Sequence, residues 1–294
     1  MEINDLKYFL AVAKEENMRV ASNSLYISQP GLTKVIQRLE NELGKSLFNR
    51  THHRLSLTED GKLLKKRAQE IIELIDKTQN ELKSQKNNLS GRIVIGCGES
   101  DGVRIITKAM KSFQDKYPNV HFQILSGNAD IIREKVENGL LDFGVLMGVA
   151  DLKKYDFIRL PYLDTWGVLM QKNSPFANKK SINLNDLLKM PLIYPSQTNG
   201  SPNIQNWFEN KYQDLNIVAS YNLIYNASLM VESGIGNAFC INKIINTFRS
   251  DKLVFIPVKP TLHSNVIFIW KKYQVFSEVN KLFLEELQRE VSNL

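Results

Sequence analysis

The stretch that most constrains the fold covers residues 21–61, which read ASNSLYISQPGLTKVIQRLENELGKSLFNRTHHRLSLTEDG. Ser28 has a hydroxyl suited to capping a new helix, and Pro30 suits the first turn because its missing N–H costs nothing there. Apolar residues then recur at helical spacing until Gly44, which ends the helix; they are Leu32, Ile36, Leu39 and Leu43. The pattern predicts a helix, a tight turn and a second helix, followed by a basic hairpin.

The opposite face of the second helix carries the side-chain types that read base edges in the major groove of DNA. Residues 19–54 contain six Lys and Arg against two Glu, a local net charge of +4. An ordinary amphipathic helix pair with a solvated face is the alternative, but the cap, the charge and the hairpin together favour DNA binding. We expect the following residues to contact DNA: Ser28, Gln29, Pro30, Thr33, Lys34, Gln37, Arg38, Arg50 and Arg54.

A longer series of residues extends this pattern on both sides; it comprises Leu6, Phe9, Val12, Ala21, Ser28-Gln29-Pro30, Leu39-Glu40, Leu43-Gly44, Leu47-Phe48, Arg50, Leu57-Thr58 and Gly61. In order and spacing, without gaps, the series resembles the N-terminal winged helix-turn-helix of LysR-type transcriptional regulators. Met18-Arg19-Val20 and Ser22 depart from the usual family residues. The resemblance implies an all-α winged helix-turn-helix domain, which we assign to residues 1–58.

Residues 59–90 are expected to form a long linker helix and a hinge. Thr58 can cap the helix, and acids at its first positions suit the helix dipole. Apolar positions then follow at steps of four and three, which is typical of a dimerisation seam; they are Leu64, Ala68, Ile71, Ile75, Thr78 and Leu82. A lone amphipathic helix packed on its own domain is the alternative. The polar segment 84–91, ending in glycine, is the natural hinge.

Residues 91–294 show strands that alternate with single helices, which predicts parallel βαβ units. The segments Tyr117-Pro118-Asn119-Val120, 139–145 and 232–236 resemble the effector domain of the same regulators. That resemblance implies a two-lobed α/β domain like the periplasmic binding proteins, with a small ligand in the cleft. We expect lobe I at about 91–162 and 268–294, and lobe II at about 163–267. Strands are expected at 166–171, 192–194, 217–223, 236–241 and 264–270 in the later part.

Ligands of parallel sheets bind beyond the carboxyl ends of the strands, near helix N-termini. Four loops meet that condition, and their polar residues are the candidate effector contacts, although helix capping alone would select the same residue types. The resemblance favours Ser100 and Thr198 in particular, while acids at 99 and 101 stand against a carboxylate ligand unless a basic residue offsets them. The candidate residues are Ser100, Asp101, Asn128, Ser196, Thr198 and Asn226.

Other function classes find little support in the sequence. The four histidines show no metal-ligand spacing, and no nucleophile motif or phosphate loop is present, so neither an enzyme nor a cofactor is expected. A thiol redox switch using Cys97 and Cys240 is an alternative, but free cysteines are commonly buried and inert.

The absence of a secretory signal or apolar span predicts a cytoplasmic protein. The expected partners are double-stranded DNA with an inverted repeat, a small-molecule effector, further copies forming a dimer or tetramer, and RNA polymerase.

Overall fold

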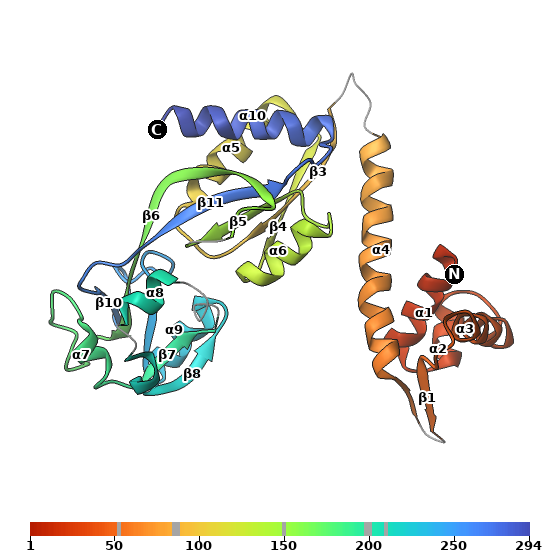
Figure 1. Cartoon of the computed structure of the whole chain (residues 1–294), viewed down its shortest axis with the longest axis horizontal. Helices are drawn as coiled ribbons and strands as arrows, with labels where there is room; N and C mark the ends of the chain where they lie inside the picture. Colours follow the sequence, from red (N-terminus) through yellow and green to blue (C-terminus); the bar gives the residue numbers. More distant parts are fainter. Residues whose placement is uncertain (52–53, 84–88, 149–150, 197–201, 209–210) are drawn as a thin grey trace. The chain divides into compact units, whose positions relative to one another are not determined.

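The computed structural model describes residues 1–51, 54–83, 89–148, 151–196, 202–208 and 211–294. The chain divides into two compact units, Met1–Lys83 and Ser84–Leu294 (Figure 1). The expected linker helix therefore groups with the N-terminal domain.

The first unit is a helix-turn-helix with a small hairpin and a long helix. Its elements are α1 (Ile3–Glu15), α2 (Met18–Ser24), α3 (Gln29–Leu43), β1 (Phe48–Thr51), β2 (Arg54–Leu57) and α4 (Glu59–Lys83). The Ser28 hydroxyl accepts a hydrogen bond from the Gly31 N–H, and Gly44 ends α3 in the left-handed conformation (φ 65°). Thr58 Oγ1 accepts from the Gly61 N–H at 2.9 Å at the start of α4. The predicted caps of both helices are confirmed.

A single apolar core joins the three short helices, the hairpin and the first turns of α4. Phe9, Leu32 and Leu39 lie at its centre and are fully buried. Gly61 explains how α4 passes so close to the hairpin, since a Cβ atom there would lie 2.1 Å from the Leu47 carbonyl oxygen. Any larger residue would push α4 away from this core.

The second unit is built on one continuous sheet whose helices cover both of its halves (Figure 1). The strand order is β4-β3-β5-β11-β6-β9-β7-β8, with β10 also paired to β6. Its elements are β3 (Gly91–Cys97), α5 (Val103–Lys116), β4 (Val120–Ser126), α6 (Ala129–Glu137), β5 (Phe143–Met147), β6 (Tyr155–Gln171), α7 (Leu184–Leu187), β7 (Leu192–Pro195), α8 (Pro202–Trp207), η2 (Lys211–Asp214), β8 (Ile217–Tyr221), α9 (Ile224–Glu232), β9 (Asn237–Ile241), β10 (Leu253–Pro257), β11 (His263–Lys271) and α10 (Glu278–Ser292).

Two lobes follow from the pairing. In one lobe β3 is parallel to both β4 and β5, and in the other β7 is parallel to both β8 and β9. The long antiparallel strand β6 connects them, because its first part pairs with β11 and its second part pairs with β9 and β10. Separate aromatic cores fill the lobes, one around Phe113 and Phe283 and the other around Tyr194 and Phe239. The two-lobed α/β architecture is confirmed.

Several expected boundaries differ from the structure. The strand expected at 166–171 is only the last third of β6, and β10 and α7 were not expected. Residues 155–165 contain Asp156, Arg159, Pro161 and Asp164, which hide the strand pattern in the sequence. The return to lobe I also comes earlier than residue 268, because Val266 already lies in the core of lobe I.

Candidate DNA-binding surface and ligand cleft

The recognition helix α3 separates its apolar and polar residues cleanly. Leu32, Ile36 and Leu39 are buried in the core, whereas Gln29 and Lys34 are exposed. Pro30 and Gln37 are exposed as well, and Ser28 is exposed while it caps the helix. Thr33 is half-buried, and its hydroxyl donates to the Gln29 carbonyl oxygen at 3.0 Å. The side chains that are free to reach a base edge are therefore mainly the amides and the lysine.

Arg38 has a partner within its own domain. Its guanidinium forms an ion pair with the carboxylate of Asp5, a buried residue of α1. A second carboxylate oxygen of Asp5 accepts from the Glu2 N–H at 3.1 Å. Arg38 thus ties α3 to α1, a role that the sequence pattern did not indicate because the two residues lie 33 positions apart.

Tyr26 is a surface residue that the sequence pattern did not identify as a DNA contact. It occupies the turn before α3 with a positive φ of 55° and is 96% exposed. A tyrosine next to Ile27 resembles a core residue. The only indication that it is exposed was that it does not fit the helical spacing of the apolar residues. Tyrosine hydroxyls are among the groups that contact DNA phosphates.

The backbones of Arg50 and Arg54 belong to the β1–β2 hairpin, but their side chains lie outside the described part of the structure.

Part of the expected dimerisation seam on α4 packs within its own domain, which corrects that expectation. Ala68 is fully buried and Leu64 is partly buried, and both pack against the core of their own domain. They belong to the intrachain face of the helix and are not available to a partner. Ile75 is half-buried, and the side chain of Leu82 lies outside the described residues.

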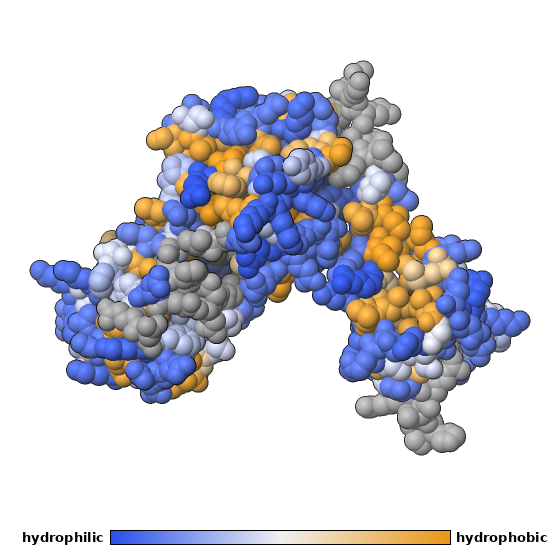
Figure 2. All heavy atoms as spheres, in the orientation of Figure 1, coloured by the Kyte–Doolittle hydropathy of each residue, from blue (hydrophilic) through white to orange (hydrophobic). Residues whose placement is uncertain are grey.

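Another face of α4 is apolar and exposed. Leu63 is 58% exposed, Ile71 is 37% exposed and Leu74 is 42% exposed. In Figure 2 apolar atoms gather along this helix. Large exposed apolar residues on one helix face mark an interaction surface. Ile71, Leu63 and Leu74 are hereafter called the α4 stripe.

A cavity of about 120 Å³ lies between the two lobes of the second unit. One lobe contributes Glu99, Gly127 and Met147 to its lining, and the other contributes Trp166, Tyr221 and Ile241. The lining is mostly apolar, as expected of small-molecule sites. The cavity sits at the ends of β3, β5 and β9, in agreement with the rule for parallel sheets.

None of the expected effector residues that the structure describes is among the lining residues of this cavity. Ser100 and Asp101 line a neighbouring hollow of about 310 Å³ that also includes Lys243. Asn128 caps α6 by accepting from the Ile131 N–H at 2.8 Å. Ser196 donates to the Tyr221 carbonyl oxygen at 3.1 Å. The last two side chains thus make the local backbone bonds that capping and turns would require.

Two further expected residues complete the set. Asn226 is exposed on the first turn of α9, and Thr198 lies outside the described residues. The neighbours of the expected residues, among them Gly98, Glu99 and Gly127, are the ones that line the cavity.

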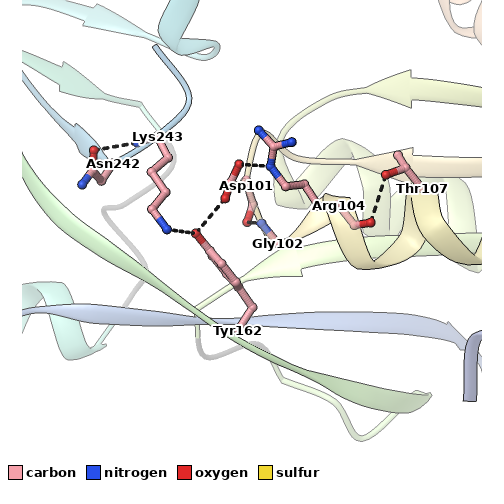
Figure 3. A network of polar contacts seen from close by, with 8 residues as sticks. Asp101, Gly102, Arg104, Thr107, Tyr162, Asn242 and Lys243 are labelled. Carbon is pink, nitrogen blue, oxygen red and sulfur yellow. Dashed lines mark hydrogen bonds and ion pairs between the residues drawn. The ribbon is translucent and has the colours of Figure 1, made fainter. Parts of the chain in front are cut away.

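Glu99 links the lobes across the cavity. Its Oε2 atom accepts a hydrogen bond of 2.6 Å from the N–H of Ile224, the first residue of α9. Burial raises the pKa of Glu99, and the hydrogen bond from Ile224 opposes that change. A second contact lies alongside: Lys243 Nζ donates to the Tyr162 hydroxyl at 3.3 Å, and that hydroxyl donates to Asp101 at 3.2 Å (Figure 3).

Asp164 lies close to this junction and is only 1% exposed. Neither of its carboxylate oxygens makes a hydrogen bond of standard geometry within the described residues. Burial raises the pKa of Asp164 to about 6, and the nearby Ser100 hydroxyl partly opposes the change. Asp101 adds to the increase and Lys243 counters it.

The two cysteines are both buried, Cys97 in lobe I and Cys240 in lobe II. Burial raises the pKa of each thiol to about 12. Because the thiolate is the form that reacts with oxidants, both cysteines are protected by their surroundings. The inert interpretation is therefore favoured.

No group of His, Cys, Asp and Glu among the described residues could hold a metal ion. None of the described helices combines the length and the apolar character that crossing a membrane requires.

The winged helix-turn-helix and the two-lobed domain with its cleft define a DNA-binding transcription regulator. The family model described as bacterial regulatory helix-turn-helix protein, lysR family, matches residues 3–62, and the model for the LysR substrate binding domain matches residues 86–292. The chain belongs to the LysR family of ligand-responsive, DNA-binding transcription regulators.

Individual relatives agree with this assignment. The chain is similar to a probable RuBisCO transcriptional regulator of Phaeodactylum tricornutum, with 27% identity over 300 residues, covering 98% of this chain and 96% of the relative. It is similar to the uncharacterised HTH-type transcriptional regulator YybE of Bacillus subtilis, with 29% identity over 187 residues and 64% of each chain covered. The crystal structure of full-length CbnR with its target DNA has the same fold, with a TM-score of 0.76 at 19% identity, covering 99% of this chain and 100% of CbnR.

Proposed function

We propose that this regulator binds an inverted-repeat operator as a dimer or a dimer of dimers. The observation that carries the proposal is the polarity of α3, where Gln29, Lys34 and Gln37 are exposed opposite a fully buried apolar face. Side chains with amide and ammonium donors pair with base edges in the major groove. The similar protein CbnR has been crystallised with its target DNA, which supports the same use of this domain here.

The residues proposed to act on DNA divide by chemistry. Gln29, Lys34 and Gln37 read bases, with Thr33 in a minor role because its hydroxyl is bound to its own helix. Tyr26 contacts phosphate, and the positive charges of Arg50 and Arg54 do so from the hairpin. Ser28 and Pro30 shape the start of the helix and bring its free N–H groups near the DNA backbone.

The α4 stripe is proposed to bind the same stripe of a second copy. Leu63, Ile71 and Leu74 are apolar, exposed and on one helix, so burying them against identical residues would release water from both helices. Two recognition helices held in one assembly would read two half-sites of an inverted repeat. RNA polymerase is a further proposed partner, and a cytoplasmic location agrees with a DNA partner.

The cavity between the lobes is proposed to hold the small-molecule effector. Its lining takes the carboxylate of Glu99 from one lobe and the aromatic rings of Trp166 and Tyr221 from the other, so a molecule bound there could prefer one arrangement of the lobes over another. A ligand shifts a regulator only through such a difference in affinity, typically about 1–3 kcal/mol. The chain thus acts by binding and not by catalysis.

A footprinting experiment tests the proposal. The full-length protein is incubated with a library of DNA duplexes, and the duplexes that it binds are selected. The selected duplexes are then tested for protection from nuclease digestion by the bound protein. We expect selection of an inverted repeat, and we expect Gln29→Ala to weaken the preference for that repeat. Selection of unrelated sequences with equal affinity would contradict the proposal.

A further inference from the structure

The cavity between the lobes has only one charged residue among its described lining residues, and that residue is Glu99. No Lys, Arg or His occurs in this lining. The undescribed segments 149–150 and 197–201 read VA and QTNGS, so they cannot supply a basic side chain either. A ligand carboxylate bound here would be removed from water beside another carboxylate without a counter-cation, which is unfavourable.

The basic residue next to the lining residue Ile244 is already engaged. Lys243 precedes the lining residue Ile244, but its ammonium donates to the Tyr162 hydroxyl at 3.3 Å and lies 5.5 Å from the centre of the Tyr162 ring. Figure 3 shows this side chain directed toward the Tyr162–Asp101 contact. Lys243 therefore already has a partner in the Tyr162 hydroxyl, and it is not among the residues that line the cavity.

Glu99 also occupies the position that an anionic ligand would use. The N–H groups at the start of a helix attract negative charge, and α9 begins at the cavity with Ile224. The Ile224 N–H donates to Glu99 Oε2 at 2.6 Å, so the protein supplies this anion itself. The other oxygen, Oε1, makes no hydrogen bond to the residues that the structure describes.

The two aromatic residues of the lining offer no free polar hydrogen to a ligand. The indole N–H of Trp166 donates to Ser264 Oγ at 2.7 Å, and the Tyr221 hydroxyl donates to the Phe239 carbonyl oxygen at 2.9 Å. Their polar hydrogens are thus committed to protein partners. The rings provide apolar surface, and aromatic rings also attract cations.

We infer that the cleft binds a small apolar molecule carrying one ammonium group, with Glu99 as its counter-ion, and that it disfavours carboxylates. The inference rests on the proposed role of the cavity as the effector site. The volume limits the apolar part, because a cavity of roughly 150 Å³ accommodates benzene and this one measures about 120 Å³. A chain of four or so carbon atoms is therefore a suitable probe.

The test compares three molecules of similar shape and different charge. Butylammonium, butanol and butyrate are titrated into the full-length protein at pH 7.5, and binding is followed by ligand-observed NMR. We expect butylammonium to bind about tenfold or more tightly than butyrate, with butanol between them. In Glu99→Gln the carboxylate is lost with little change of shape, so the ratio between the two ions should fall to about one.

A matched control removes a different negative charge from the same lobe. Asp130→Asn changes an exposed carboxylate of α6 that pairs with Arg133 and does not line the cavity. This variant should keep the wild-type ratio. Loss of the ratio in Asp130→Asn as well would mean that overall charge, and not Glu99, causes the preference, and the inference would fail.

The other outcomes are equally decisive. Butyrate binding as tightly as butylammonium to the wild-type protein overturns the charge preference but leaves a ligand cleft in place. Failure of butylammonium to bind overturns the inference, whereas the proposed effector role of the cleft does not depend on these three probes. Operator binding, measured on the same sample, decides the DNA-binding proposal separately. If Glu99→Gln does not fold, the wild-type ratio together with Glu99→Asp, which should keep the preference, still decides the question.

Discussion

Arg38 of the recognition helix α3 forms an ion pair with Asp5 of α1, and the Asp5 side chain is buried while the arginine is partly exposed. The pair connects α3 to α1 through a contact between residues 33 positions apart. An arginine proposed from the sequence to contact DNA therefore has a structural partner within its own domain. Its effect on DNA binding should include a contribution from stability.

Arg38→Ala should destabilise the full-length protein. Removal of the guanidinium leaves a buried carboxylate without its main partner, which costs about 1–3 kcal/mol. Arg38→Lys should restore part of the loss, and Gln37→Ala should show none because Gln37 is exposed. Urea unfolding measures all three variants, and an Arg38→Ala midpoint equal to that of the wild type would show that Asp5 finds another partner.

Gln29→Ala and Arg54→Ala should affect DNA binding in different ways. Gln29 reads a base, so its loss should cost about 1–3 kcal/mol at the operator and little on random duplex. Arg54 contributes charge, so its loss should weaken both DNAs alike and lower the slope of affinity against salt by about one. Titrations at several salt concentrations measure both effects. Equal losses of specificity in the two variants would refute this division.

Replacement of Ile71 and Leu74 by lysine should disrupt the oligomer. Facing lysines across an apolar contact would bring like charges together where water is excluded. Sedimentation should then show a smaller species, and affinity for the operator should fall more than affinity for random duplex. Gln69→Lys is the matched control, since it adds charge at an exposed polar position of α4. If the assembly is unchanged, the α4 stripe is not the interface.

Neither cysteine should act as a sensor of oxidants. Both thiols are buried, and their pKa values are raised to about 12, so the reactive thiolate is scarce at neutral pH. Cys97→Ser and Cys240→Ala should therefore respond to peroxide as the wild type does. Operator binding before and after treatment with peroxide gives the comparison. If the wild type responded to peroxide and either variant did not, the redox-switch hypothesis would be supported.

Asp164→Asn should stabilise the protein at neutral pH. Burial raises the pKa of Asp164 to about 6 from its ordinary 3.8. The folded state thus holds the proton more tightly than the unfolded state, and stability is lost as pH rises through about 6. Asparagine removes this cost, a gain on the order of 1–3 kcal/mol at pH 7.5. Unfolding at pH 7.5 and 4.5 should show the gain shrinking at the lower pH, and a less stable variant at pH 7.5 would contradict the account.

The sequence determined the parts of this protein that depend on neighbouring residues. The Ser28 cap, the apolar face of α3 and the end at Gly44 all involve contacts within one or two turns, so their residue types and spacing suffice. The same is true of the Thr58 cap and of the alternation of strands and helices. Local patterns also carried the family resemblance.

Only the tertiary structure decided which residues meet across long stretches of chain. Glu99 and Ile224 are 125 positions apart, and Arg38 and Asp5 are 33 apart, so no spacing rule connects them. The sequence also did not decide which face of α4 is exposed and which packs against its own domain. Apolar residues occur on two faces of that helix, and Ala68 is buried because the domain core lies against one of them. Burial is a property of the whole packed domain, and periodicity alone cannot assign it.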